Sequence, residues 1–145
     1  MKQSRMSLAL ESGALDLPAA GKLAVFGARA GDDLSMLPRD RVRIIQGFAP
    51  DHDAWAARGY QVGVAPAGPY AAALIFLPRA KAEAHAVVAE AVAHTPGGVI
   101  VVDGQKTDGI DSIYKACRRR AHVPEALSKA HGKLFWFSSG PGFED

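Results

Sequence analysis

The sequence contains little of what stabilises secreted or membrane proteins. Its single cysteine, Cys117, excludes an internal disulfide and a cysteine zinc cluster. No apolar run approaches the ~18 residues that a membrane-spanning helix needs. The first residues, MKQSRMSLALESG, lack the apolar core of about 7–15 residues that marks a signal peptide. These absences predict a cytoplasmic protein with no membrane partner.

The chain also lacks a marked excess of charge of either sign. Its 17 basic and 15 acidic side chains give a formal net charge of +2, so net charge alone does not indicate a nucleic-acid partner. Hydrophobic residues make up 48% of the 145 positions, which suits one globular domain of ordinary size. We expect a single domain over residues 1–137 and a linker-like tail over residues 138–145.

Short apolar runs alternate with helical patterns along the chain, which predicts an α/β fold with a mostly parallel sheet. Residues 83–94, EAHAVVAEAVAH, repeat apolar side chains at helical spacing, as expected for a helix packed on a sheet. Asp51 is predicted to cap a shorter helix that ends near Gly59. The last part of the chain predicts an antiparallel hairpin around His131 and Gly132. The predicted buried strands are residues 23–27, 42–48, 60–65, 72–77 and 98–104.

Ligands of open α/β sheets bind beyond the carboxyl ends of the strands, and these ends carry weak signals here. The run Gly27 to Gly31 does not have the G-x-G-x-x-G spacing of a dinucleotide loop. Gln46 stands near the place where a ribose-binding acid is expected. Leu77 and Pro78 end the fourth strand without a carboxylate, amide or nucleophile. No catalytic or cofactor-binding residue is therefore predicted.

Metal and thiol chemistry are also poorly supported. Asp51, His52 and Asp53 could ligate a metal, but two acids at a helix start more often stabilise the helix end, so no metal site is predicted. Cys117 repeats with Ile110 and Ile113 on one apolar stripe, which favours a core thiol over a nucleophile.

One short basic segment remains as a binding candidate. Lys115, Arg118 and Arg119 lie at i, i+3 and i+4 on one helix surface, and Lys106 lies on the preceding loop. Such a cluster could meet the phosphates of RNA, whereas cations at a helix C-terminus also complement the helix dipole on an ordinary solvated face. Both interpretations stay open at this point.

Three segments carry a family resemblance: AALIFLPRAKAEA, GGVIVVDGQKTDGIDS and AHGKLFWF. They resemble the N-terminal, non-catalytic half of small-subunit ribosomal RNA guanine-N2 methyltransferases, and the likeness runs from about Leu8 to Phe137. These S-adenosylmethionine enzymes have two tandem Rossmann-like domains. In that family the second domain holds the cofactor loop and an Asn-Pro-Pro-aromatic motif, and neither has a counterpart in this chain.

The resemblance implies a Rossmann-like methyltransferase fold with helices on both faces, strand order 3-2-1-4-5-7-6 and an antiparallel C-terminal hairpin. It implies that S-adenosylmethionine binds in a separate catalytic domain, and that this domain and ribosomal RNA are the partners. Two alternatives remain, a complete small enzyme that binds S-adenosylmethionine or another nucleotide at Gly27 to Gly31, and a folding scaffold with no RNA contact. In the hairpin, we expect Leu134 and Trp136 to share one face of the strand, and Phe135 and Phe137 the other.

Overall fold

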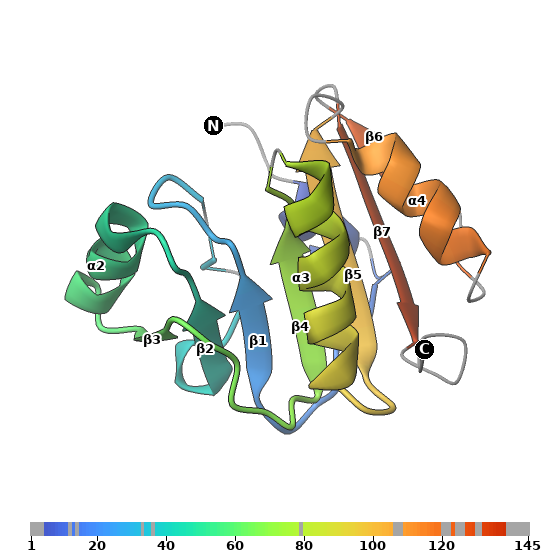
Figure 1. The fold of residues 1–145 in the computed structure, drawn as a ribbon. Coiled ribbons are helices and arrows are strands. Elements are labelled where there is room, and N and C mark those ends of the chain that lie inside the picture. The colour runs from blue at the N-terminus through green and yellow to red at the C-terminus, as the bar shows by residue number, and fades with distance from the viewer. Residues whose placement is uncertain are drawn as a thin grey trace.

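A single seven-stranded sheet runs through the computed structural model (Figure 1), which describes residues 5–11, 13, 15–32, 34–35, 37–78, 80–105, 109–119, 123, 127–129 and 132–138. The strand order is β3-β2-β1-β4-β5-β7-β6, which confirms the predicted order. β5 and β6 each pair antiparallel with β7, and the other neighbouring pairs are parallel. The strands are β1 (Leu23–Phe26), β2 (Val42–Ile45), β3 (Gln61–Gly63), β4 (Ala72–Phe76), β5 (Val99–Gln105), β6 (Leu127–Lys129) and β7 (Gly132–Ser138).

Helices cover both faces of this sheet, which explains why the central strands are apolar throughout. All four residues of β1 are buried, as expected for a parallel strand covered on both sides. In Figure 1, α3 and α4 lie on the same face, α3 in front of β4 and α4 beside β7. The helices are α1 (Arg5–Glu11), the short 3-10 helix η1 (Arg39–Arg41), α2 (Ala49–Ala57), α3 (Lys81–Ala93) and α4 (Ile110–Arg118).

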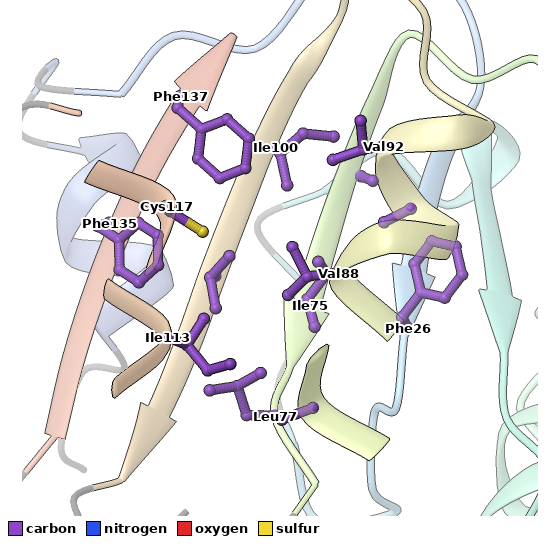
Figure 2. Close-up of a cluster of buried hydrophobic side chains, with 14 of the residues drawn as sticks. Phe26, Ile75, Leu77, Val88, Val92, Ile100, Ile113, Cys117, Phe135 and Phe137 are labelled. Atoms are coloured by element: carbon purple, nitrogen blue, oxygen red, sulfur yellow. The ribbon is translucent and has the colours of Figure 1, made fainter. Parts of the chain in front are cut away.

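The larger hydrophobic cluster lies between the sheet and the α3/α4 layer (Figure 2). The predicted stripe of α3 enters it, with Ala84, Val88, Ala91 and Val92 buried. Cys117 of α4 is also buried in this cluster, as its apolar spacing predicted. Each fully buried large side chain of such a core stabilises the fold by about 1.5–3 kcal/mol.

The second cluster lies on the opposite face, where α1, the segment after β1 and Trp55 of α2 pack against the sheet. One charged contact lies beside it. The Arg5 Nε of α1 donates to the Asp103 Oδ1 of β5 over 2.5 Å, and the two side chains are only 8% and 12% exposed. A buried ion pair therefore fixes the first helix to the carboxyl end of β5.

Strand β7 has the alternation that its sequence predicts. Leu134 and Trp136 pack with the second cluster, whereas Phe135 and Phe137 belong to the first. The Phe135 and Phe137 rings stack with their centroids 6.4 Å apart. The hairpin partner β6 pairs with β7 as expected, although His131 and residues 139–145 lie outside the described residues.

Three local predictions are wrong. The strand predicted as buried over residues 60–65 is the edge strand β3, which spans only Gln61–Gly63 and has no buried residue. Helix α2 begins at Ala49, with Phe48 as its N-cap residue, so Asp51 lies in the first turn and does not cap the helix. Its carboxylate instead accepts a hydrogen bond from the backbone of Ala30. The strand predicted over residues 42–48 is shorter than expected, because β2 ends at Ile45 and Phe48 is already the N-cap residue of α2. Gly59 takes the left-handed conformation predicted for it, with φ of +91°.

No helix within the described part of the chain has the length and apolar character needed to cross a membrane.

Candidate functional site

A cleft of about 870 Å³ opens at the carboxyl ends of β1, β2 and β4. This is the place where open α/β sheets bind ligands, because the strand order reverses between β1 and β4. Phe26, Phe48, Phe76 and Pro78 line the cleft. Val87 and Glu90 of α3, together with the loop after β1, complete its walls.

The loop after β1 approaches β4 closely, and Gly27 makes this approach possible. Gly27 has φ of +76°, and a Cβ placed on it would lie 2.7 Å from the Phe76 carbonyl oxygen. Packing against β4 therefore explains this glycine without reference to a ligand. The next residue, Ala28, is completely buried.

The polar groups of this loop bond to the protein itself. The Ala30 N–H donates to Asp51 Oδ1 over 3.0 Å, and the Arg29 N–H donates to Asp32 Oδ2 over 2.7 Å. The Arg29 guanidinium donates to the Leu77 carbonyl at 3.1 Å, across the carboxyl end of the sheet. The amides that could face a bound nucleotide are thus paired with the protein's own carboxylates.

Gln46 occupies the end of β2, where a ribose-binding acid was sought in the sequence. Its Nε2 donates to the Ala28 carbonyl over 2.8 Å, and its Oε1 accepts from the Phe48 N–H over 2.9 Å. The Trp55 indole N–H donates to the same Ala28 carbonyl over 3.1 Å. Both ends of the Gln46 amide hold the loop in place, and this arrangement does not fit a ribose.

Burial raises the pKa of the Asp32 carboxyl above its usual value of 3.8. The hydrogen bond from the Arg29 amide and the Arg29 charge oppose this rise, and the neighbouring Asp51 charge adds to it. Ionised Asp32 consequently carries a desolvation cost in the folded protein. The stability that the protonated Asp32 carboxyl provides, relative to the ionised carboxylate, is fully present below the unfolded-state pKa. It is lost as the pH rises through the raised folded-state pKa.

Replacing Asp32 with Asn should therefore raise the melting temperature modestly at neutral pH. The Asn side-chain oxygen can still accept from the Arg29 N–H, while the charge of the partly buried carboxylate is removed. The gain should shrink at acidic pH, where the wild-type carboxyl is protonated. The melting temperatures of both proteins, measured from acidic to neutral pH, check the expectation. A variant that is less stable than the wild type at neutral pH would contradict it.

The basic cluster predicted from sequence lies on the outer surface of α4. Ile110, Ile113 and Cys117 turn one side of the helix into the core, whereas Lys115, Arg118 and Arg119 are exposed. The cations lie toward the C-terminal end of the helix and Asp111 lies in its first turn, an order that complements the helix dipole. Lys106 lies outside the described residues.

Tyr114 and Lys133 also lie on this surface, although the helical spacing of the cations alone did not predict them. The Arg118 guanidinium lies 5.4 Å and the Lys133 ammonium 5.3 Å from the centroid of the Tyr114 ring. Lys133 also pairs with Asp111 over 2.6 Å. The alternation of β7 could have found Lys133, because it places Lys133 on the same face as Phe135, which contacts Tyr114.

The Tyr114 ring is already surrounded by these neighbours. Phe135 packs against it with a centroid distance of 5.1 Å, and the two cations approach it from α4 and β7. We define the basic face as Lys115, Arg118, Arg119 and Lys133. Its described side chains combine positive charge with an aromatic ring that its neighbours already contact.

The positions where the sequence was searched for a catalytic motif and for metal ligands make contacts within the protein itself. Leu77, where the catalytic motif would follow the fourth strand, is buried, and its N–H donates to the Asp103 carbonyl over 2.9 Å. Arg79 lies outside the described residues. His52 pairs with Asp53 over 3.3 Å while Asp51 bonds to the loop after β1. Within the described part of the chain, no group of three or more His, Cys, Asp or Glu side chains could hold a metal.

The sheet order, the antiparallel last strand and the cleft at the switch point define a Rossmann-like methyltransferase fold. Over residues 43–140 the sequence matches the family described as methyltransferase small domain N-terminal. The chain belongs to this family. A search of curated protein sequences finds no match.

Solved structures with this fold include several methyltransferases. The 16S rRNA N2 methyltransferase RsmC of T. thermophilus superposes with a TM-score of 0.72 at 18% identity, over 87% of this chain and 37% of that one. A candidate methyltransferase from Pseudomonas syringae gives a TM-score of 0.68 at 15% identity, over 90% and 94%. A candidate RNA methyltransferase from Pyrococcus horikoshii gives 0.65 at 13% identity, over 93% and 81%. The chain thus spans little more than a third of the T. thermophilus protein.

Proposed function

We propose that this chain is the non-catalytic N-terminal domain of an S-adenosylmethionine-dependent ribosomal RNA guanine-N2 methyltransferase. In this role it supports the catalytic domain of the same protein and helps to position the RNA, in the cytoplasm. One observation carries the proposal: the groups at the carboxyl end of the sheet that would hold a cofactor bond to the protein itself. Gln46 and the Ala30 amide are the main examples.

A cofactor with a ribose needs an acceptor for its hydroxyl groups at the end of β2, and it needs free backbone N–H groups in the loop after β1. Gln46 uses both ends of its amide internally, and the Arg29 and Ala30 N–H groups donate to Asp32 and Asp51. Binding S-adenosylmethionine would break these hydrogen bonds without offering equivalent partners. The residues at this cleft therefore do not fit the cofactor.

We expect the isolated chain to show no stoichiometric binding of S-adenosylmethionine by titration calorimetry. The matched control is the full product of the reading frame that encodes this chain, which should bind one cofactor through its catalytic domain. A micromolar, stoichiometric isotherm for the isolated chain would contradict the proposal and favour a complete small enzyme. An Asn-Pro-Pro-aromatic motif after this domain in the reading frame would support the two-domain arrangement directly.

RNA contact is assigned to the basic face on α4 and β7. Lys115, Arg118 and Arg119 are exposed, and Lys133 lies beside them. Cations that contact phosphate release condensed counterions, so they raise affinity for every RNA sequence alike and make binding depend on salt. This chemistry suits a domain that holds ribosomal RNA while another domain selects the nucleotide.

Reversing Lys115, Arg118 and Arg119 to Glu should weaken ribosomal RNA binding and flatten its salt dependence. Removing one cation that binds a phosphate should reduce the log–log slope by about 0.7 for single-stranded RNA. The fold should tolerate the change, because exposed charges at a helix end contribute about 0.3–1 kcal/mol each. Salt titrations of RNA binding, made with the full protein and with this chain, provide the measurement.

Lys22→Glu serves as a control for net charge, because Lys22 is exposed directly before β1 and away from α4. It should reduce affinity much less per reversed charge than the triple variant does. If the folded triple variant keeps the wild-type slope and affinity, the basic face is an ordinary solvated surface. The domain is then a scaffold without RNA contact.

A further inference from the structure

Two large apolar side chains are strongly exposed, and they lie at the ends of neighbouring strands. Among the described residues these are Phe48, which is 62% exposed, and Val64, which is 71% exposed. Phe48 follows β2 and Val64 directly follows β3. A Cβ built on Gly47 would lie 3.8 Å from Val64 Cγ1, so the Val64 side chain reaches the residue that precedes Phe48.

This pair adjoins the cleft at the carboxyl end of the sheet. Phe48 lines the cleft together with Phe76, Pro78 and Val87. We call these five residues the strand-end surface: Phe48, Val64, Phe76, Pro78 and Val87. Single exposed apolar residues need no explanation, whereas an apolar group beside a hollow is typical of an interaction site. A small ligand inside the cleft would still leave Val64 uncovered, which favours a macromolecular partner.

The charges around the strand-end surface do not favour RNA. Asp51 and Glu90 line the cleft, and among the described residues Arg29 is the cation that lines it with them. The Arg29 guanidinium already donates to the Leu77 carbonyl. A polyanion would meet two carboxylates at this cleft, whereas it would meet cations on the basic face of α4. α4 packs beside β7, on the far side of α3 from α2 (Figure 1).

We propose that the strand-end surface is the docking site for the catalytic domain of the same protein, which places an apolar segment with a basic side chain against the cleft. This inference rests on the proposed function. The matched part of the T. thermophilus protein is 37% of its chain, so a protein of that architecture has a larger remainder that could pack against this domain. The apolar pair provides surface to bury, and the two carboxylates provide charge complementary to a basic contact.

Hydrogen–deuterium exchange of the full reading-frame product, compared with this chain alone, tests the docking site. The backbone amides of residues 47–49, 51–52 and 63–65 should exchange at least about tenfold more slowly in the full protein, as burial in an interface limits local opening. The double variant Phe48→Asp/Val64→Asp should abolish this protection in the full protein. It should not unfold this chain, because Phe48 is the N-cap residue of α2, where Asp is favourable.

Ala89→Asp is the matched control, because it adds a carboxylate at an exposed position of α3. It should leave the protection unchanged. Equal exchange in the full protein and in the chain alone would overturn the proposal. Protection that appears only when ribosomal RNA is added, or that rises with the concentration of this chain alone, would also overturn it and assign the surface to RNA or to a second copy.

The docking site and the proposed function can fail separately. If the isolated chain binds S-adenosylmethionine, or if the reading frame contains no catalytic domain, the proposed function fails and the docking site fails with it. If the isolated chain binds no cofactor and the full protein shows no protection at residues 47–49, 51–52 and 63–65, the docking site alone is wrong.

Discussion

Replacing Asp103 with Ala should lower the free energy of unfolding by about 3–5 kcal/mol, because it leaves the buried Arg5 guanidinium without its carboxylate. The Arg5 and Asp103 side chains are only 8% and 12% exposed, so little water can replace the carboxylate as a partner. The pair also joins α1 to the end of β5, and its removal should therefore loosen the first helix. Urea unfolding followed by circular dichroism gives the free energy directly.

The double variant Arg5→Met/Asp103→Leu is the control for this experiment. Replacing both members of a buried pair with apolar side chains of similar size is often neutral, so the double variant should recover most of the stability that Asp103→Ala loses. If Asp103→Ala lowers the free energy of unfolding by less than about 1 kcal/mol, the ion pair of Arg5 and Asp103 contributes no more than an exposed ion pair does.

Replacing Trp55 with Ala should cost about 3–5 kcal/mol, the usual range for removing a large buried aromatic side chain. Trp55 is 2% exposed, and it packs edge-on against Tyr60 with ring centroids 5.0 Å apart. The Arg58 guanidinium lies 4.6 Å from the Trp55 ring centroid. The substitution also removes the indole donor to the Ala28 carbonyl, so it should disturb the loop after β1.

Trp55→Phe separates packing from hydrogen bonding. It keeps most of the ring volume and removes the donor, so it should cost clearly less than Trp55→Ala. Both variants should speed hydrogen exchange in residues 28–30, because both leave the Ala28 carbonyl with Gln46 as its remaining side-chain donor. If Trp55→Ala unfolds at the wild-type urea concentration, α2 does not stabilise the sheet as its burial suggests.

The parts of the fold that could be predicted from sequence are those set by local pattern. The runs that form β1, β4 and β5 are apolar on both faces because helices cover both sides, and this composition is visible without coordinates. The stripe of α3 and the alternation of β7 follow from helical and strand periods. The strand order came from the family resemblance, since periodicity alone does not order a sheet.

The contacts that decide the site lie between residues far apart in sequence, and local pattern does not predict them. Asp51 has the residue type and position of a helix cap, yet its hydrogen-bond partner is the Ala30 amide, 21 residues earlier. Gln46 could be recognised as the absence of an acid, but its bond to the Ala28 carbonyl spans 18 residues. Lys133 is paired with Asp111 across α4 and β7, so helical spacing in the sequence indicates only the α4 part of the basic face.

The two hydrogen bonds of Gln46 make this cleft difficult to redesign as a nucleotide site. A carboxylate at this position could accept from the Phe48 N–H but could not donate to the Ala28 carbonyl. The Arg29 and Ala30 amides would remain engaged with Asp32 and Asp51. Grafting a cofactor onto this domain would therefore require several coordinated substitutions, and each one alone would weaken the loop before any ligand could compensate.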